Sequence, residues 1–312
     1  MKLAALSVDL DEIPCYHAIH GLPMPEDASA HAVYAHAVPR YLDLLGSLGV
    51  PCTFFVIGRD LDDAVAVDGV RVLATAGHEL ANHSLNHRYD LTRLTPAEVR
   101  AEVRGGVEAL RRAAGVAPTG FRAPGYTITD EVFDALAEAG AAYDSSVFPC
   151  PAYWAAKATA IGLIRARGRR SHSVVDTPAV LTSPADPYLP ARPYWRRAEH
   201  GASLIELPIG VTRGARLPYI GTSVMAAGPV AARALTAQMD GRPLVNLELH
   251  GIDVLDVGDG LEALRPHQHD VRVPVARKLE TLRAVVGDLT ARGYSFVTLA
   301  EAARHFARSL AG

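Results

Sequence analysis

The feature that most constrains the fold is an alternation of short apolar segments with helical patterns that stop at glycine. Apolar runs at 3–10, 51–58 and 119–123 are each typical of a buried strand. The helical patterns between them stop at residues such as Gly49 and Gly115, which suit the left-handed position after a helix. Because a strand–helix–strand order makes successive strands parallel, this repetition predicts an α/β fold with a parallel sheet or barrel.

Composition is consistent with one soluble globular domain. The chain has 312 residues, of which 49% are hydrophobic and 21% charged. This length is large for one ordinary core, but barrels of this size commonly form a single domain, and no internal repeat suggests otherwise. We therefore expect one domain over 1–312. The net charge of -3 and the pI near 6.5 indicate no nucleic-acid partner, and no apolar run is long enough for membrane insertion.

The compartment is inferred from the first residues and from the cysteines. Acidic residues at Asp9, Asp11 and Glu12 follow only a few apolar positions, which leaves too short a stretch for a signal peptide. The three cysteines are widely spaced and form no Cys-x-x-Cys pair, so we interpret them as free thiols in a reducing compartment. The expected location is cytoplasmic.

Regularity fails between 146 and 202. This stretch carries several prolines and both tryptophans, and it is expected to be a long irregular insertion in the domain. Its aromatic residues argue that it is functional, since disordered linkers lack them. The basic run at 165–170 is interpreted as a solvated helix face, with a phosphate site as the alternative.

Two histidines, His83 and His87, provide the first sign of chemistry. Four residues apart, they are expected to share one face of a helical turn, close enough to bind one metal ion. Alone the pair is weak evidence, because about 0.5 such pairs are expected by chance at this histidine content. A hydrogen-bonded pair on a helix surface would then be the favoured interpretation.

Three further polar groups strengthen the metal interpretation. Asp9 and Asp11 end the first strand, Arg122-Ala123-Pro124-Gly125 follows a later one, and His250 ends another. In a βα-barrel the working residues stand at the carboxyl ends of the strands, so all these groups are expected to meet at one face. The structural alternatives are a solvated strand end, a surface cation, an ordinary turn and a buried hydrogen-bonded histidine.

Together these residue types point to metal-assisted hydrolysis of an amide or, less favoured, an ester. A carboxylate and two neutral imidazoles form a usual ligand set for a divalent ion, which lowers the pKa of water and polarises a carbonyl. In Asp-x-Asp both carboxylates project to the same side of the strand, so one can bind metal while the other accepts a proton. Arg122 would hold that second carboxylate, an N–H after Pro124 would face the oxyanion, and His250 would protonate the departing amine.

The four motifs resemble those of the polysaccharide deacetylases, the NodB-homology enzymes of carbohydrate esterase family 4. The resemblance extends from Leu3 to Leu299 and rests on four segments: 7–11 (Ser-Val-Asp-Leu-Asp), 82–87 (Asn-His-Ser-Leu-Asn-His), 121–125 (Phe-Arg-Ala-Pro-Gly) and 249–250 (Leu-His). It implies a distorted (β/α)7-type barrel. It also implies hydrolysis of a carbon–nitrogen amide bond on an acylated amino sugar.

The resemblance also implies a role for each residue. Asp9 would be the catalytic base, Arg122 its tether, the Gly125 amide the oxyanion donor and His250 the general acid. The metal ligands would be Asp11, His83 and His87. The ion would be Zn²⁺, with Co²⁺, Mn²⁺, Fe²⁺ and Ni²⁺ as other divalent candidates.

One departure bears on the substrate. The commoner first motif of the family has adjacent aspartates, whereas Leu10 separates them here, as in a subgroup of cytoplasmic sugar deacetylases, allantoinases and deformylases of lipid-linked aminoarabinose. We therefore expect removal of an acetyl or formyl group from an amino sugar, on a soluble or lipid-linked envelope precursor read by 146–202. The acidic partner of His250 is not fixed by the motifs; Asp176 and Glu206 are candidates.

Two other functions stay open. A cyclic-amide hydrolase of the allantoinase kind would need a small closed pocket, and a barrel that only binds carbohydrate would have lost turnover. Retention of Asp9, Arg122 and His250 argues against the second alternative. The sugar, the acyl group and any homo-oligomer stay open as well.

Overall fold

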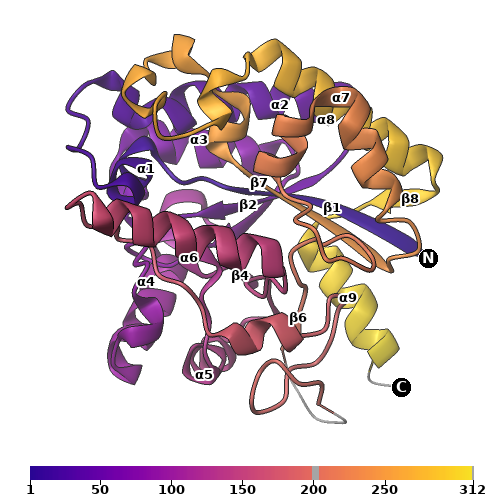
Figure 1. Ribbon diagram of the computed structural model, residues 1–312. Helices are drawn as coiled ribbons and strands as arrows, with labels where there is room; N and C mark the ends of the chain where they lie inside the picture. Colours follow the sequence, from indigo (N-terminus) through magenta and orange to yellow (C-terminus); the bar gives the residue numbers. More distant parts are fainter. Residues whose placement is uncertain (199–203, 311–312) are drawn as a thin grey trace.

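The protein is built on one parallel sheet that curls toward a barrel. The computed structural model describes residues 1–198 and 204–310. Within them the sheet has eight strands in the order β6-β5-β4-β3-β2-β1-β7, with β8 pairing to the beginning of β1 (Figure 1). The strands are β1 (Lys2–Asp9), β2 (Cys52–Val56), β3 (Glu79–Asn82), β4 (Gly120–Phe121), β5 (Tyr143–Asp144), β6 (Ile205–Glu206), β7 (Leu244–His250) and β8 (Tyr294–Phe296).

The sheet nearly closes between its two ends. Residues that follow β6 approach β7, where the Gly210 N–H donates to the Asn246 carbonyl at 2.9 Å. The Asn246 side chain donates in turn to the carbonyls of Leu207 and Pro208, both at 3.2 Å. These bonds join β6 and β7 without a regular ladder, as in a distorted barrel. The predicted fold class, a distorted (β/α)7-type barrel, is confirmed.

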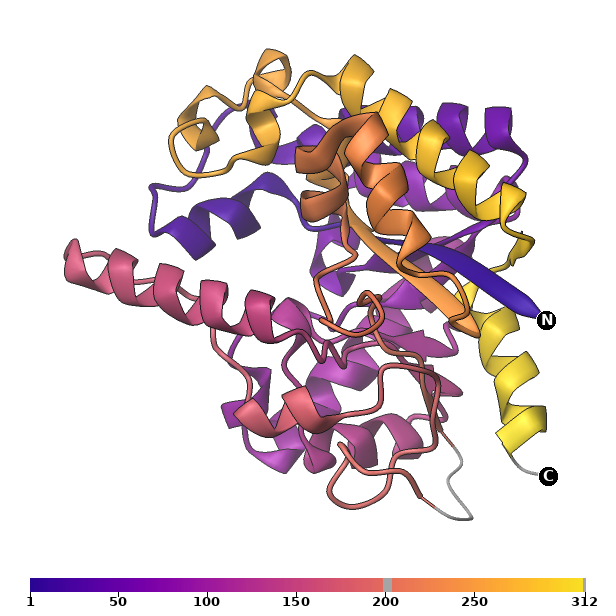
Figure 2. The ribbon, with the colours of Figure 1, turned by 45° about the vertical axis from the view of Figure 1, so that its right-hand side comes forward.

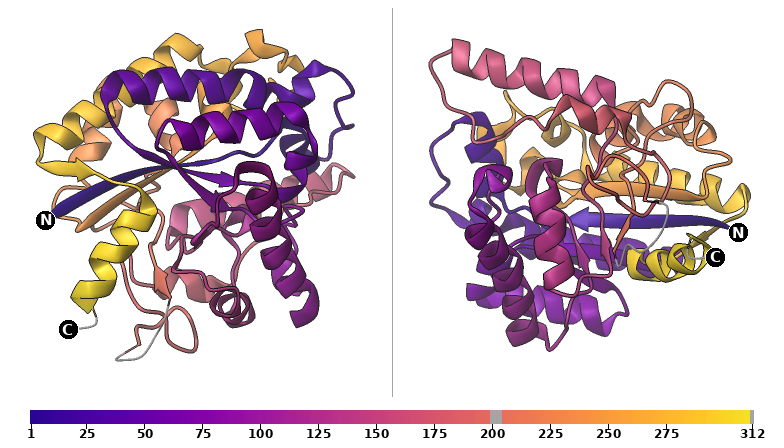
Figure 3. Two further views of the ribbon diagram at one scale, coloured as in Figure 1. Left: turned by 180° about the vertical axis from the view of Figure 1, so that it is seen from behind. Right: turned by 90° about the horizontal axis from the view of Figure 1, so that it is seen from below.

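Helices cover the sheet, as βα repetition requires. The described helices are α1 (Ile13–His20), α2 (Val38–Leu48), α3 (Ala64–Thr75), α4 (Pro96–Ala114), α5 (Asp130–Glu138), α6 (Pro151–Ala166), α7 (Gly221–Ala237), α8 (Val275–Ala291) and α9 (Leu299–Leu310). From behind, α2 and α3 lie side by side over the sheet (Figure 3, left). The strand β1 is buried on both of its faces, which fits its unbroken apolar run.

Local sequence signals account for several helix ends. Thr95 and Glu98 form the reciprocal hydrogen bonds of a capping box at the start of α4. The helix ends at Gly115, which adopts φ 69°, a conformation that costs glycine little. The sequence Thr95-Pro96-Ala97-Glu98 predicts the start of this helix and Gly115 predicts its end, and both are confirmed.

Two helices were not expected from the sequence. The prolines and the glycine of 12–25 predict a loop, but this stretch contains α1. The segment 146–202, expected to be irregular, contains the 16-residue helix α6. Figure 2 shows α6 as a long rod that runs out beside α1. The sequence pattern also predicts a short helix over 70–76, whereas α3 begins earlier, at Ala64. The sequence also predicts a strand over 203–207. Its first residue, Ser203, lies outside the described residues, as do residues 199–202 of the expected insertion.

In the described ranges, no helix combines the length and the hydrophobicity needed to cross a lipid bilayer.

Candidate functional site

The candidate site lies at the carboxyl ends of the parallel strands. Asp9 is the last residue of β1 and His250 the last of β7, and the two are direct partners in the parallel ladder. The same register pairs Ser7 with Glu248 one step earlier. Because side chains alternate along a strand, Asp9 and Ser7 share a face with His250 and Glu248. Convergence of strand-end residues at one edge is therefore observed for these two strands.

Arg122 is fully buried and anchors Asp9. Its Nη1 donates to Asp9 Oδ1 at 2.7 Å. Its other donors reach Ser7 Oγ, Ser145 Oγ and the Ser145 carbonyl, each at 2.9 Å. The guanidinium carbon also lies 4.1 Å from the centroid of the Phe55 ring. A buried arginine with all these partners fixes the Asp9 carboxylate in one orientation.

Asp11, His83 and His87 form a compact group of donor atoms. The Nε2 atoms of both histidines lie 3.2 Å from Asp11 Oδ1, and His83 Nε2 is 3.7 Å from Asp9 Oδ2. His83 Nδ1 donates to the Arg122 carbonyl at 2.8 Å, which leaves Nε2 facing Asp11. Asp11, His83 and His87 offer ligand atoms within 4.8 Å of one another.

The prediction that His83 and His87 share a helical turn is wrong. They occupy a loop after β3, in which Ser84 and His87 have φ values of 66° and 52°. A non-glycine residue rarely adopts this conformation, and such strain is frequently found at functional sites. The Ser84 hydroxyl accepts a hydrogen bond from the His87 N–H at 3.0 Å and so supports this backbone.

This group fits a divalent cation. Asp11 Oδ1 and His87 Nε2 are buried without a hydrogen-bond partner in the described structure, an arrangement that a cation would satisfy. Burial acts to raise the pKa of Asp11, but His87 and His83 outweigh it and hold that pKa well below its usual value. Burial lowers the pKa of His87, which favours the neutral form that binds metal.

His250 has an acidic partner that the motifs did not reveal. His250 Nδ1 lies 2.8 Å from Glu248 Oε1, and Glu248 is fully buried. Burial acts to lower the pKa of His250, but the charge and contact of Glu248 raise it well above the usual value for histidine. Glu248 therefore favours the protonated form of the ring. Its Nε2 lies 3.3 Å from the Tyr126 hydroxyl.

The candidates Asp176 and Glu206 are wrong as partners of His250. Glu206 lies beside Asp144 in the register of β5 and β6 and accepts the Val147 N–H at 3.1 Å. Asp176 accepts from the Tyr194 hydroxyl at 3.4 Å. The partner could have been found from the sequence, because Glu248 and His250 are two residues apart on one strand and so share a face.

Asp9, Glu248 and His250 also offer ligand atoms within 4.8 Å of one another. Arg122 already pairs with Asp9, and Glu248 already contacts His250 and favours its protonated form. A cation is therefore disfavoured here, and the arrangement suits proton transfer instead.

Gly125 occupies a tight turn after β4. Its φ of 63° suits glycine, and a Cβ atom there would lie 3.1 Å from the Tyr89 ring. The Gly125 carbonyl accepts a hydrogen bond from Lys157 Nζ of α6 at 2.7 Å. Burial lowers the pKa of Lys157 to about 8. The segment expected to be an irregular insertion thus supplies a half-buried lysine that holds this turn.

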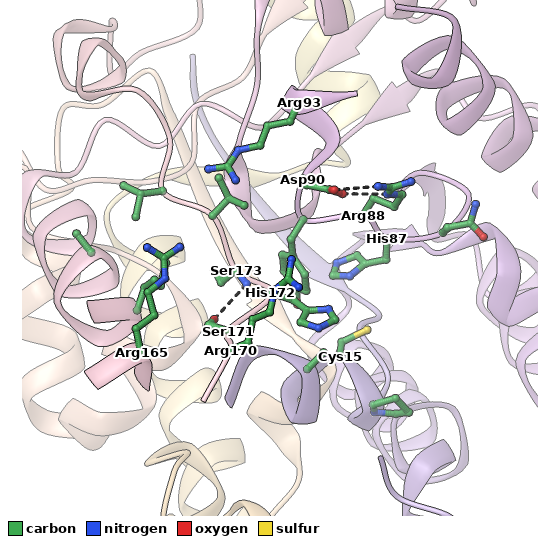
Figure 4. Close-up of a pocket in the computed structure, with 18 of the residues that line it drawn as sticks. Cys15, His87, Arg88, Asp90, Arg93, Arg165, Arg170, Ser171, His172 and Ser173 are labelled. Atoms are coloured by element: carbon green, nitrogen blue, oxygen red, sulfur yellow. Dashed lines mark hydrogen bonds and ion pairs between the residues drawn. The ribbon is translucent and has the colours of Figure 1, made fainter. Parts of the chain in front are cut away.

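A cavity of about 910 Å³ adjoins the metal-ligand group at His87 (Figure 4). Its walls come from α1, from the loop after β3 and from α6 with the residues that follow it. The size is near the upper end of the usual range for small-molecule sites, about 300–1,000 Å³. A small molecule could therefore reach the candidate metal centre from this side.

Comparison with known proteins shows a similarity to one family. Residues 27–143 match the family model described as polysaccharide deacetylase. The chain is 41% identical over 105 residues to a chitooligosaccharide deacetylase from Bradyrhizobium, an alignment that covers 33% of this chain and 47% of that protein. The chain thus spans about half the length of the curated relatives it matches. The family match includes His83, His87 and Arg122 but not Asp9 or His250.

Solved structures support the fold over nearly the full length. A crystal structure from Mycobacterium smegmatis, named as a polysaccharide deacetylase, has a TM-score of 0.53 at 21% identity and covers 94% of this chain and 92% of its own. A family 4 pseudoenzyme from Bacillus anthracis has a TM-score of 0.51 at 13% identity, covering 96% and 64%. These likenesses concern the fold alone, since the second protein is named a pseudoenzyme. The motifs and the match over residues 27–143 lead to one conclusion: this chain is similar to the polysaccharide deacetylases, and it shares their barrel fold.

Proposed function

We propose that this protein is a divalent-metal-dependent hydrolase that removes the N-acetyl group from an amino sugar. The observation that carries the proposal is the separation of two neighbouring carboxylates: Asp11 faces the two histidines, whereas Asp9 is bound by Arg122. One carboxylate is thus available as a ligand while the other is free to accept a proton. The relative named chitooligosaccharide deacetylase supports the substrate class.

Asp11, His83 and His87 would hold the ion, with Zn²⁺ as the first candidate because two imidazoles and a carboxylate suit it. When bound there, a divalent ion would polarise the acyl carbonyl and make water more acidic. Burial acts to lower the pKa of His83, but Asp9 and Asp11 raise it above its usual value. Because the proton on His83 competes with a cation, we expect metal affinity to fall as the pH falls.

The chain's own residues would manage the proton. Asp9, oriented by Arg122, would accept a proton from the attacking water. The Gly125 N–H would face the oxyanion, in a turn that Lys157 holds from its carbonyl side. His250, kept protonated by Glu248, would deliver a proton to the departing nitrogen. The base and the acid come from neighbouring strands, so a substrate amide can lie between them.

Two observations bear on the alternatives. A cyclic-amide hydrolase would need a small closed pocket, and the cavity of about 910 Å³ favours a larger substrate. A barrel that only binds carbohydrate would not need a buried acid–base pair, because Glu248 without turnover would be a costly buried charge. Both observations favour an acylated sugar and a working enzyme.

The first prediction is release of amine from an acylated amino sugar. The protein, loaded separately with Zn²⁺, Co²⁺ and Mn²⁺, should release amine from N-acetyl sugars, and N-formyl analogues are assayed alongside them. Fluorescamine detection of the new amine measures it, and the stripped protein is the control. If every metal-loaded sample leaves all acetylated and formylated sugars intact, in free, polymeric and lipid-linked form, the proposal fails.

The second prediction concerns pH. Because Glu248 raises the pKa of His250, the protonated acid should persist to alkaline pH, and activity should decline only as the pH rises through that raised pKa. Glu248→Gln removes the charge, so this decline should move to lower pH while the acid side of the profile stays unchanged. The kcat profile against pH measures both. Glu280→Gln, on α8, is the matched control, and an unshifted alkaline limb in Glu248→Gln would contradict the assignment.

A further inference from the structure

The cavity beside His87 is lined by an excess of arginine. Asp90 is the one acidic residue among those that line it. Five arginines contribute to its walls: Arg59, Arg88, Arg93, Arg165 and Arg170. The chain as a whole has a net charge of -3, so this concentration of positive charge is local. A neutral sugar needs no such lining, which makes the charge a feature to be explained.

Part of this charge is already neutralised. Arg88 donates to both carboxylate oxygens of Asp90, at 2.9 and 2.8 Å, and Arg59 lies 3.8 Å from Asp60. Arg93, Arg165 and Arg170 make no ion pair with a carboxylate anywhere in 1–198 or 204–310. Three guanidinium groups are therefore available around one cavity.

These three arginines come from separate parts of the chain. Arg93 belongs to the turn before α4, Arg165 to the last turn of α6, and Arg170 to the segment after α6. That segment is held against α1 by the His172 N–H, which donates to the Ala18 carbonyl at 3.3 Å. Figure 4 shows Arg93 and Arg165 around the same space that His87 borders.

This placement changes the interpretation of the basic run 165–170. As a solvated helix face it would lie along α6, but α6 ends at Ala166, so only Arg165 is in the helix. Arg165 and Arg170 both line the cavity. The three arginines are exposed side chains from separate segments that line one cavity, so an anion bound in this cavity would offset the repulsion between their like charges.

We propose that the substrate carries an anionic group, a phosphate ester or a carboxylate, that binds between Arg93, Arg165 and Arg170 while its N-acyl group lies at the His87 end. This inference rests on the proposed function and specifies its substrate: an acylated amino sugar with a negative charge. Guanidinium pairs suit both phosphate and carboxylate oxygens, so the shared chemistry is an oxyanion.

The test measures binding, so that it does not depend on turnover. Calorimetric dissociation constants are obtained with Zn²⁺-loaded Asp9→Asn protein, which should leave the sugars intact. The probes are N-acetylglucosamine, N-acetylglucosamine 1-phosphate and N-acetylmuramic acid, so phosphate and carboxylate form separate arms. At least one charged sugar should bind tenfold or more tightly than the neutral one, and the difference should shrink as salt is raised.

Substitution shows whether the arginines or the metal ion bind the anionic group of the sugar. Arg93→Gln with Arg165→Gln should remove the advantage of the charged sugar and leave the affinity for N-acetylglucosamine unchanged. Arg283→Gln, exposed on α8 outside the cavity, is the control. Equal affinities for all three sugars, or an advantage that survives the double substitution, would overturn the proposal. Tight charged-sugar binding without amine release from wild type would instead refute the hydrolase and leave the anion site standing.

Discussion

Asp9→Asn should reduce kcat by about 10²–10⁴-fold, the usual contribution of general base catalysis, while the protein keeps its metal. Asparagine retains the oxygen that accepts the Arg122 hydrogen bond, so the local geometry should persist. It lacks the charge needed to take a proton from water. Metal should stay because the substitution leaves the proposed ligand Asp11 in place. His83 Nε2 lies closer to Asp11, at 3.2 Å, than to Asp9, at 3.7 Å.

Two measurements on the same sample decide this prediction. Amine release gives kcat, and elemental mass spectrometry gives metal per chain. Asp68→Asn, which removes an exposed carboxylate from α3, is the matched control and should behave as wild type. Undiminished turnover in Asp9→Asn would refute the base assignment, and loss of metal would make Asp9 a ligand.

The sheet and most of the site could be predicted from the sequence because both depend on local order. An apolar run followed by an acid marks the end of a buried strand, as Asp9 shows after β1. Since parallel strands end at one edge, the polar residues after them are brought together whatever the details of the loops. Asp9, Asp11, His83, His87, Arg122 and His250 meet for this reason.

The missed helices show where composition misleads. Prolines at the start of α1 and α6 suggested irregular structure, yet Pro14 and Pro151 occupy the first turn, where the missing N–H costs nothing. In α6 the alanine-rich run that follows has high helix propensity. A proline in the first turn of a helix and a proline in a loop cannot be told apart from the proline alone. Only the residues that follow the proline distinguish the two cases.

Other details depend on contacts across the fold. The loop that carries His83 and His87 has positive φ values that no spacing rule gives, since a histidine pair four residues apart equally fits a helix. The three free arginines also could not be grouped by sequence, because Arg93 and Arg165 are brought together only by the placement of α6. The Glu248–His250 pair is different, because alternation along β7 was sufficient to predict it.

The candidate metal centre leads to the second large effect. His83→Ala should lose most of the bound metal, because it deletes one of three protein ligands and the hydrogen bond to the Arg122 carbonyl. Activity should fall to the level of the stripped wild-type protein. His36→Ala, an exposed histidine outside the ligand group, is the matched control for the loss of an imidazole.

Stability gives a readout that is independent of catalysis. An ion bound to the folded state alone stabilises it by about 2.7 kcal/mol at 100 times its dissociation constant. A chelator should therefore lower the Tm of wild type and His36→Ala, and should leave the Tm of His83→Ala nearly unchanged, since that variant has little ion to lose. If His83→Ala retained one metal per chain and the full chelator response, the ion would have to be held elsewhere. The unpartnered Asp11 Oδ1 and His87 Nε2 atoms argue against such a site, because they would then stay buried with their desolvation uncompensated.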